Sequence, residues 1–268
     1  MRKRSFTILL FSVFLCQASL SQEMTSFAGD TSLYTQIRLQ VSKLSDSLLS
    51  EPNNSMLFFK RGNLLFDIEE WKKAEADISK AISLEPGNFI YYYKRGGTRD
   101  RLNKYSDAYE DYNKAIELNP AYHWAYLDRG LILNKSNVFK DADADFRHAL
   151  QLQPNWGAAL FCIGENFSDQ DNVDSAMYYY KRAIFFDSLQ YKAYNNLGTI
   201  YNKQKKYDLA IEQFDKALKV WSGYTFALTN RAQAKYDKGD KAGACADMKK
   251  AIDLGRKDKI PVYKLYCE

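Results

Sequence analysis

The sequence predicts an all-α solenoid built from six helix–turn–helix units, and regular columns of small residues predict it. One alanine column recurs every 34 residues from Ala74 to Ala244, and a second follows it seven residues later. A glycine column with the same spacing runs from Gly62 to Gly198. A fixed period of this length is the signature of a repeat array. We therefore expect six units, covering residues 55–88, 89–122, 123–156, 157–190, 191–224 and 225–258.

Each unit has the pattern of two helices joined by a short turn. In the fifth unit, apolar and small residues recur at three- and four-residue spacing from Tyr194 to Tyr201, and again from Ala210 to Ala217. This spacing places them on one face of a helix. Glycine in the first helix and alanine in the second mark the crossing point, where the two backbones come too close for a larger side chain.

The fifth unit also resembles a known repeat family. Its residues match the tetratricopeptide pattern W-x2-L-G-x2-Y…A-x3-F, which has the same period, as Tyr194-x2-Leu197-Gly198-x2-Tyr201…Ala210-x3-Phe214. The resemblance covers about residues 55–258. It implies a right-handed superhelix whose first helices line the inner face, and a protein-binding scaffold.

Basic residues depart from the family pattern at two positions of the first helix. Arginine replaces the usual leucine in four units, at Arg61, Arg95, Arg129 and Arg231. Arg99 and Lys235 stand where the family normally has an apolar or aromatic residue.

The first 21 residues have the layout of a secretory signal peptide. Basic residues 2–4 precede an apolar run from Phe6 to Leu15, and small residues follow before Gln22. We expect cleavage near Ser21, a lead-in at 22–30, and a periplasmic or secreted protein. An uncleaved anchor is the alternative. Lipidation of Cys16 is a second alternative, which Leu15 disfavours because lipoprotein signals have a small residue there.

Capping helices are predicted at both ends of the array. Residues 31–54 contain an apolar stripe of helical spacing from Leu33 to Leu48, and Pro261 can open a short final helix within 259–268. Terminal units need such covers because their outer faces have no neighbour. The C-terminal stretch from Gly239 to Gly255 resembles the C-terminal units of Gram-negative envelope proteins, so a bacterial source is expected.

Composition and charge exclude several function classes. Mean hydropathy is −0.48 and no apolar run approaches 20 residues, which excludes a polytopic membrane protein. Without residues 1–21, the chain has 35 basic and 33 acidic residues. A net charge of +2 gives no electrostatic reason to expect a nucleic-acid partner. His123 and His148 are the only histidines, and no catalytic, nucleotide-binding or metal-binding motif is present. We expect neither an enzyme nor a cofactor.

The inner face of the solenoid is the predicted binding site. Counted from the start of each unit, positions 2, 5, 9 and 12 of the first helix point away from its packing positions and toward the groove. An apolar groove that becomes polar suits an extended peptide or an amphipathic helix. Alternatively, the same aromatic residues pack against neighbouring helices. The predicted contact residues are Phe59, Asn63, Tyr93, Trp124, Leu127, Phe161, Asn195, Asn202 and Gln233.

Two other binding modes are alternatives to this one. Tyr93, Trp124 and Phe161 could instead stack on sugar rings, which would make the chain a glycan-binding module. Some members of the family use a clamp of Lys, Asn and Arg for a peptide's C-terminal carboxylate. Asn63 and Lys94 offer fragments of that clamp, but Phe59 and Tyr93 occupy the place of its first lysine, so we do not expect it.

Cys245 and Cys267 are candidates for one disulfide. Cys245 lies in the last second helix, and Cys267 ends the capping helix that should fold back onto it. The bond would close a loop of about 20 residues and stabilise an end that would otherwise fray. The alternative is two small, partly buried thiols. Cys162 is expected to be a packing residue.

Overall fold

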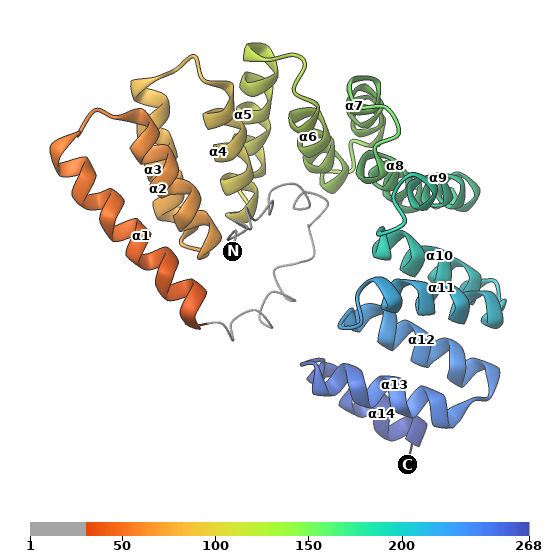
Figure 1. Cartoon of the computed structure of the whole chain (residues 1–268). Coiled ribbons are helices and arrows are strands. Elements are labelled where there is room, and N and C mark those ends of the chain that lie inside the picture. Colours follow the sequence, from red (N-terminus) through yellow and green to blue (C-terminus); the bar gives the residue numbers. More distant parts are fainter. Residues whose placement is uncertain (1–30, 268) are drawn as a thin grey trace, which may run out of the picture.

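The computed structural model describes residues 31–267 and, for side chains, residues 33–267. Within this range every regular element is a helix, and the helices follow one another in an open arc (Figure 1). The all-α solenoid fold is therefore confirmed. The predicted signal peptide at 1–21 and the lead-in at 22–30 lie outside the described residues.

Helix α1 (Thr31–Ser50) opens the described chain, and the next twelve helices form six successive pairs. A 3₁₀ turn (Lys257–Lys259) and α14 (Ile260–Cys267) follow the last pair. The pairs are α2 (Ser55–Asp67) with α3 (Trp71–Leu84), α4 (Phe89–Arg101) with α5 (Tyr105–Leu118), α6 (His123–Lys135) with α7 (Phe139–Leu152), α8 (Gly157–Asp169) with α9 (Val173–Phe186), α10 (Tyr191–Lys203) with α11 (Tyr207–Val220), and α12 (Thr225–Lys238) with α13 (Lys241–Asp253).

Small residues lie where the two helices of a pair cross. A Cβ atom placed on Gly198 would lie 2.6 Å from Cε1 of Phe214, and one on Gly164 would lie 2.6 Å from Cδ1 of Tyr180. Both alanine columns are fully buried in the second helices. The periodic columns therefore set how closely the helices of each pair approach.

The turn inside each pair repeats one backbone conformation. Position 15 of every unit has a positive φ angle, from 56° at Asp171 to 99° at Gly239. Asparagine, aspartate and glycine tolerate this left-handed region better than other residues, and they occupy four of the six positions. Glu69 and Lys205 adopt it as well, so the pairing of the helices imposes this geometry regardless of side chain.

The first helices form the inner side of the arc. Each second helix packs against the first helix of the next unit, and first helices also contact one another, as α4 does with α6 and α6 with α8. In Figure 1, α6 and α8 lie nearer the hollow of the arc than α7 and α9. Residues on the free side of the first helices therefore line its inner face.

The arginines that depart from the family pattern form ion pairs that link three helices. Arg129 on α6 donates to both carboxylate oxygens of Asp145 on α7, at 2.6 and 2.8 Å, and to Asn113 on the preceding α5. Arg61, Arg95 and Arg231 make the same two-pronged contact with the aspartate sixteen residues ahead: Asp77, Asp111 and Asp247 respectively.

Units four and five lack this pair. Ile163 and Leu197 replace the arginine, and Tyr179 and Gln213 replace the aspartate.

Among the described helices, no segment is long and apolar enough to cross a bilayer.

Candidate functional site

The fifth position of the first helix is buried in units two to five. Tyr93, Leu127, Phe161 and Asn195 expose 6% of their surface or less. Tyr93 packs against Tyr112 of its own unit and against Tyr122, which precedes the next unit, with ring centroids 6.0 and 4.9 Å apart. The expectation that these four residues face an open groove is wrong, because successive units stack closely enough to cover them.

The other predicted residues remain partly accessible. Phe59, Asn63, Trp124, Asn202 and Gln233 are half-buried. The indole of Trp124 packs edge-on against Trp156 at 4.5 Å, and the ring of Phe59 lies 4.6 Å from that of Tyr91. Neighbouring rings therefore cover part of each of these two side chains.

An open depression of about 420 Å³ lies at the start of the inner face, between α1 and α2. Leu44 and Leu64 supply its apolar part, Lys43 and Lys60 its cations, and Gln40 and Asn63 its amides. The predicted residue Asn63 therefore belongs to a concave surface. Such a surface can accept an apolar side chain beside an acidic group.

The inner face of units four to six carries a chain of polar contacts. Glu165 on α8 accepts hydrogen bonds from Tyr180 at 2.5 Å and from Asn196 at 2.6 Å. Asn195 donates to Asn196 at 3.2 Å, and Asn230 donates to Asn195 at 3.0 Å. Burial raises the pKa of Glu165, so its proton is held more tightly than that of an exposed carboxyl.

Two other amides of the inner face differ in how they are used. Gln233 accepts a hydrogen bond from Tyr266 of α14 and donates to Asp237 at 2.8 Å. The side-chain oxygen of Asn202 is buried and accepts no hydrogen bond from the described residues. The amides expected to hold a peptide backbone are thus mostly engaged with one another or with the cap.

Asp128 is a buried carboxyl that the sequence patterns did not reveal. It lies at position 6 of the third unit, exposes 3% of its surface, and neither of its oxygens accepts a hydrogen bond from the described residues. Burial raises its pKa well above the ordinary value. Nearby Tyr93 and Lys94 oppose this shift of the pKa, and the negative charge of Asp100 adds to it.

The sequence carried only a weak signal for this acid. Position 6 holds lysine in the first two units and asparagine in the last two, so an aspartate there is unusual within the chain. That it is buried could be learned only from the stacking. Lys94, at the same position one unit earlier, has its pKa lowered by burial, with Asp67 and Asp128 opposing the shift.

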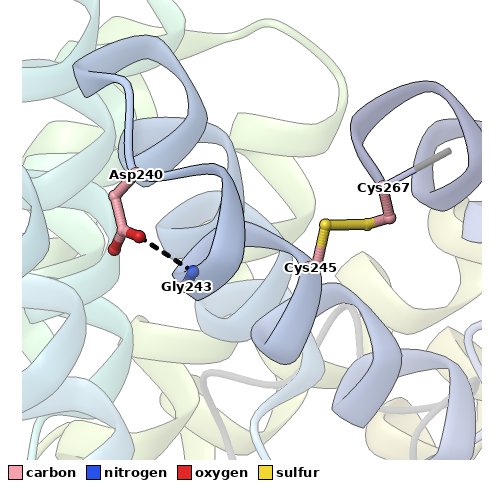
Figure 2. Close-up of a disulfide and its surroundings, with 4 residues drawn as sticks. All are labelled: Asp240, Gly243, Cys245 and Cys267. Carbon is pink, nitrogen blue, oxygen red and sulfur yellow. Dashed lines mark hydrogen bonds between the residues drawn. A yellow bond between two sulfur atoms is a disulfide. The ribbon is translucent and has the colours of Figure 1, made fainter.

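A disulfide fastens the C-terminal end of the array. Cys245 on α13 and Cys267 on α14 are bonded, with Cα atoms 5.7 Å apart (Figure 2). The start of α13 is capped nearby, since Asp240 accepts a hydrogen bond from the backbone N–H of Gly243 at 2.9 Å. Tyr266 stacks on Tyr236 with ring centroids 4.0 Å apart. Helix α14 therefore covers the last unit.

Cys162 is buried in α8.

Metal-binding geometry is absent from the described part of the chain: no group of three or more His, Cys, Asp or Glu side chains there could hold an ion. Neither histidine has an acid–base partner of catalytic type among the described residues. His123 packs against Trp156 with ring centroids 4.9 Å apart, and burial lowers its pKa. His148 lies 4.2 Å from the ring of Tyr126.

Sequence comparison identifies the repeats. Family models described as the tetratricopeptide repeat match residues 191–224 and 90–122. This chain contains tetratricopeptide repeats. No curated protein matches it in sequence. Tetratricopeptide repeats are generally non-catalytic modules that bind proteins or peptides, and the two matches place such modules in this chain.

Solved structures with the same fold cover between 63% and 91% of this chain. A tetratricopeptide repeat protein from Parabacteroides merdae ATCC 43184 is 19% identical, with a TM-score of 0.70 over 91% of this chain and 96% of that one. A chain of the APC/C Cut9–Hcn1 hetero-tetramer is 17% identical, with a TM-score of 0.72 over 85% of this chain. This chain spans 46% of that chain's length. MamA from Desulfovibrio magneticus RS-1 is 17% identical, with a TM-score of 0.55 over 63% of this chain and 96% of that one. At these identities the likeness concerns the fold.

Proposed function

We propose that this tetratricopeptide repeat protein is an exported, non-enzymatic scaffold or assembly factor of the cell envelope, and that it binds a partner polypeptide on its inner face. The observation that carries the proposal is the depression between α1 and α2, where Leu44 and Leu64 lie among lysines and amides. Exposed Met56 and half-buried Phe59 and Trp124 extend this apolar surface along the first helices.

Export is supported by two features at opposite ends of the chain. Residues 1–21 have the order of a signal peptide. The bond between Cys245 and Cys267 is of a kind that persists in oxidising compartments and is rare in the cytosol. Purification from the native host followed by intact-mass measurement tests this proposal. We expect a mature chain that begins at Gln22. A chain that keeps Met1 would contradict cleavage of the signal, and lipid on Cys16 would mean export as a lipoprotein instead.

Photo-crosslinking tests the inner face. A photoreactive amino acid at Asn63 or Trp124 should capture a polypeptide in living cells, because both side chains lie on the proposed surface. The matched control replaces exposed Glu110 on the second helix α5. Mapping the crosslinked peptides identifies the partner. Capture from Glu110 and none from the two inner positions would contradict the proposal.

A glycan-binding role has less support. Two of the three rings expected to stack on sugars, those of Tyr93 and Phe161, are buried. Of the three, only Trp124 is half-buried and so partly accessible. Its fluorescence should therefore remain unchanged when peptidoglycan fragments or polysaccharides are added, and a saturable change would revive the glycan role.

A further inference from the structure

The outer face of the fourth unit carries an exposed apolar patch. Tyr178 and Phe185 on α9, and Leu189 just after it, expose 56%, 82% and 68% of their surfaces. Tyr178 and Phe185 are seven residues apart, so they lie on the same side of the helix. Figure 1 shows α9 on the side of the arc away from the hollow, so this patch is separate from the inner face.

The patch is peculiar to the fourth unit, because the other units hold small or polar residues at both helix positions. At the position of Tyr178 the other units hold Ala76, Glu110, Ala144, Glu212 and Ala246. At the position of Phe185 they hold Ser83, Glu117, Gln151, Lys219 and Asp253. Five units adopt the same fold without aromatic side chains at these positions, so the fold does not need them. Exposed apolar clusters on proteins mark interaction surfaces.

Substitutions in the same helix leave two cations without acids. In the third unit Arg147 pairs with Asp143 at 2.6 Å, and in the fifth unit Lys216 pairs with Glu212 at 2.6 Å, each four residues earlier. In the fourth unit the corresponding acids are replaced by Met177 and Tyr178.

Lys181 and Arg182 consequently form no ion pair with any described residue. The guanidinium of Arg182 lies between two rings, 5.7 Å from the centroid of Tyr178 and 5.9 Å from that of Phe186. The patch therefore combines exposed rings with two positive charges, each of which lacks the carboxylate found beside one counterpart, Arg147 or Lys216, in a neighbouring unit.

We propose that Tyr178, Lys181, Arg182, Phe185 and Leu189 form a second docking surface, which binds an acidic amphipathic helix of a partner protein. Apolar side chains of that helix would cover Phe185 and Leu189, and its carboxylates would replace the acids missing beside Lys181 and Arg182. A second copy of this chain on the same patch is disfavoured, because a twofold contact would place these cations against one another.

The test is a selection that does not require the partner to be known. A displayed library of random helical peptides is enriched on the purified full chain and counter-selected on the variant Tyr178→Glu with Phe185→Lys. These two residues are those of the fifth unit, Glu212 and Lys219, so the variant should fold as the wild type does. Circular dichroism checks its folding. Trp124→Ala serves as the inner-face control.

We expect enriched peptides with apolar residues on one helical face and more acidic than basic residues. Their affinity should fall at least tenfold on the double variant and on Lys181→Glu with Arg182→Glu, and stay unchanged on Trp124→Ala. Enrichment of basic peptides, or equal binding to the double variant, would overturn the proposal. So would a wild-type dimer in sedimentation equilibrium that the double variant abolishes, since a second copy would then be the occupant.

Discussion

Units one, two, three and six join their helices differently from units four and five. In the first group an arginine donates to an aspartate sixteen residues ahead and to a polar side chain of the preceding helix. In units four and five, Ile163 and Leu197 occupy the same place and bury apolar surface. The same helix pair is thus compatible with an ion pair or an apolar contact, provided that the arginine and the aspartate are replaced together.

The two groups also differ on the inner face. Between units four and five the polar link runs through Glu165, which joins Tyr180 of its own unit to Asn196 of the next. In the third unit, by contrast, the buried carboxylate oxygens of Asp128 accept no hydrogen bond from the described residues. Buried polar groups are therefore satisfied unevenly along the array: Glu165 accepts two hydrogen bonds, whereas Asp128 accepts none from the described residues.

Breaking one ion pair should give the largest effect. Arg129→Leu leaves Asp145 nearly buried without its cation, and removing one member of such a pair costs about 3–5 kcal/mol. Urea unfolding with hydrogen exchange of α6 and α7 measures the loss. The control is Arg38→Leu, which breaks an exposed pair with Glu70 and should cost less than about 1 kcal/mol. Equal losses for the two variants would contradict the buried character of the Arg129 pair.

Removing the disulfide should have the next largest effect, confined to the sixth unit. Cys245→Ser with Cys267→Ser opens a link across 22 residues, worth about 3 kcal/mol in the chain-entropy account. Hydrogen exchange should accelerate in α13 and α14 and stay unchanged in α6 and α7. Unchanged exchange in α14 would show that Tyr266 and its neighbours hold the cap by themselves.

Neutralising Asp128 should stabilise the third unit. Because its folded pKa is raised, the folded state holds this proton more tightly than the unfolded state does. The stabilisation is present below the ordinary pKa, near 4 for aspartate, and is lost as pH rises through the folded value. Asp128→Asn should therefore gain about 1–3 kcal/mol at pH 7. It should also reduce the fall in stability above pH 4.

Thermal unfolding between pH 4 and pH 8 compares this variant with Asp141→Asn, which alters an exposed carboxyl of the same unit. The titratable and charged groups that face Asp128 are Tyr93, Lys94, Asp100, Tyr112, Tyr122 and Lys135. An Asp128→Asn variant with the wild-type pH profile would contradict the prediction.

The smallest net change is expected from exchanging a whole pair. Arg129→Leu with Asp145→Gln gives the third unit the residues found at 197 and 213 of the fifth. Since apolar replacements of buried ion pairs are often neutral, stability should return to within about 1 kcal/mol of the wild type. A double variant as unstable as Arg129→Leu would mean that Asn113, which loses its donor, carries the cost.

The sequence predicted the fold because steric exclusion at a helix crossing leaves a periodic trace. Gly198 and Phe214 are one such contact, repeated every 34 residues. The arginine–aspartate pairs were not predicted, although the sequence carries a signal for them: Asp145 stands sixteen residues after Arg129, and the acid is absent from both units that lack the arginine.

The candidate site was less predictable, because helical periodicity gives the side of a helix and not the distance to the next unit. Tyr93 and Phe161 point toward the inner side, and yet the stacking of units buries them. The depression at Asn63 depends on how α1 lies against α2, which no periodic column records. The outer patch at Phe185 was visible as a break in the repeat, but its exposure required the structure.

The bond between Cys245 and Cys267 also makes the two ends of the array unequal in how easily they unfold. In a solenoid each unit touches only its neighbours, so melting begins at whichever end is held least firmly. With its last helix tied covalently to α13, the C-terminal end cannot peel away one helix at a time. Unravelling should then start from α1 and advance toward the tether.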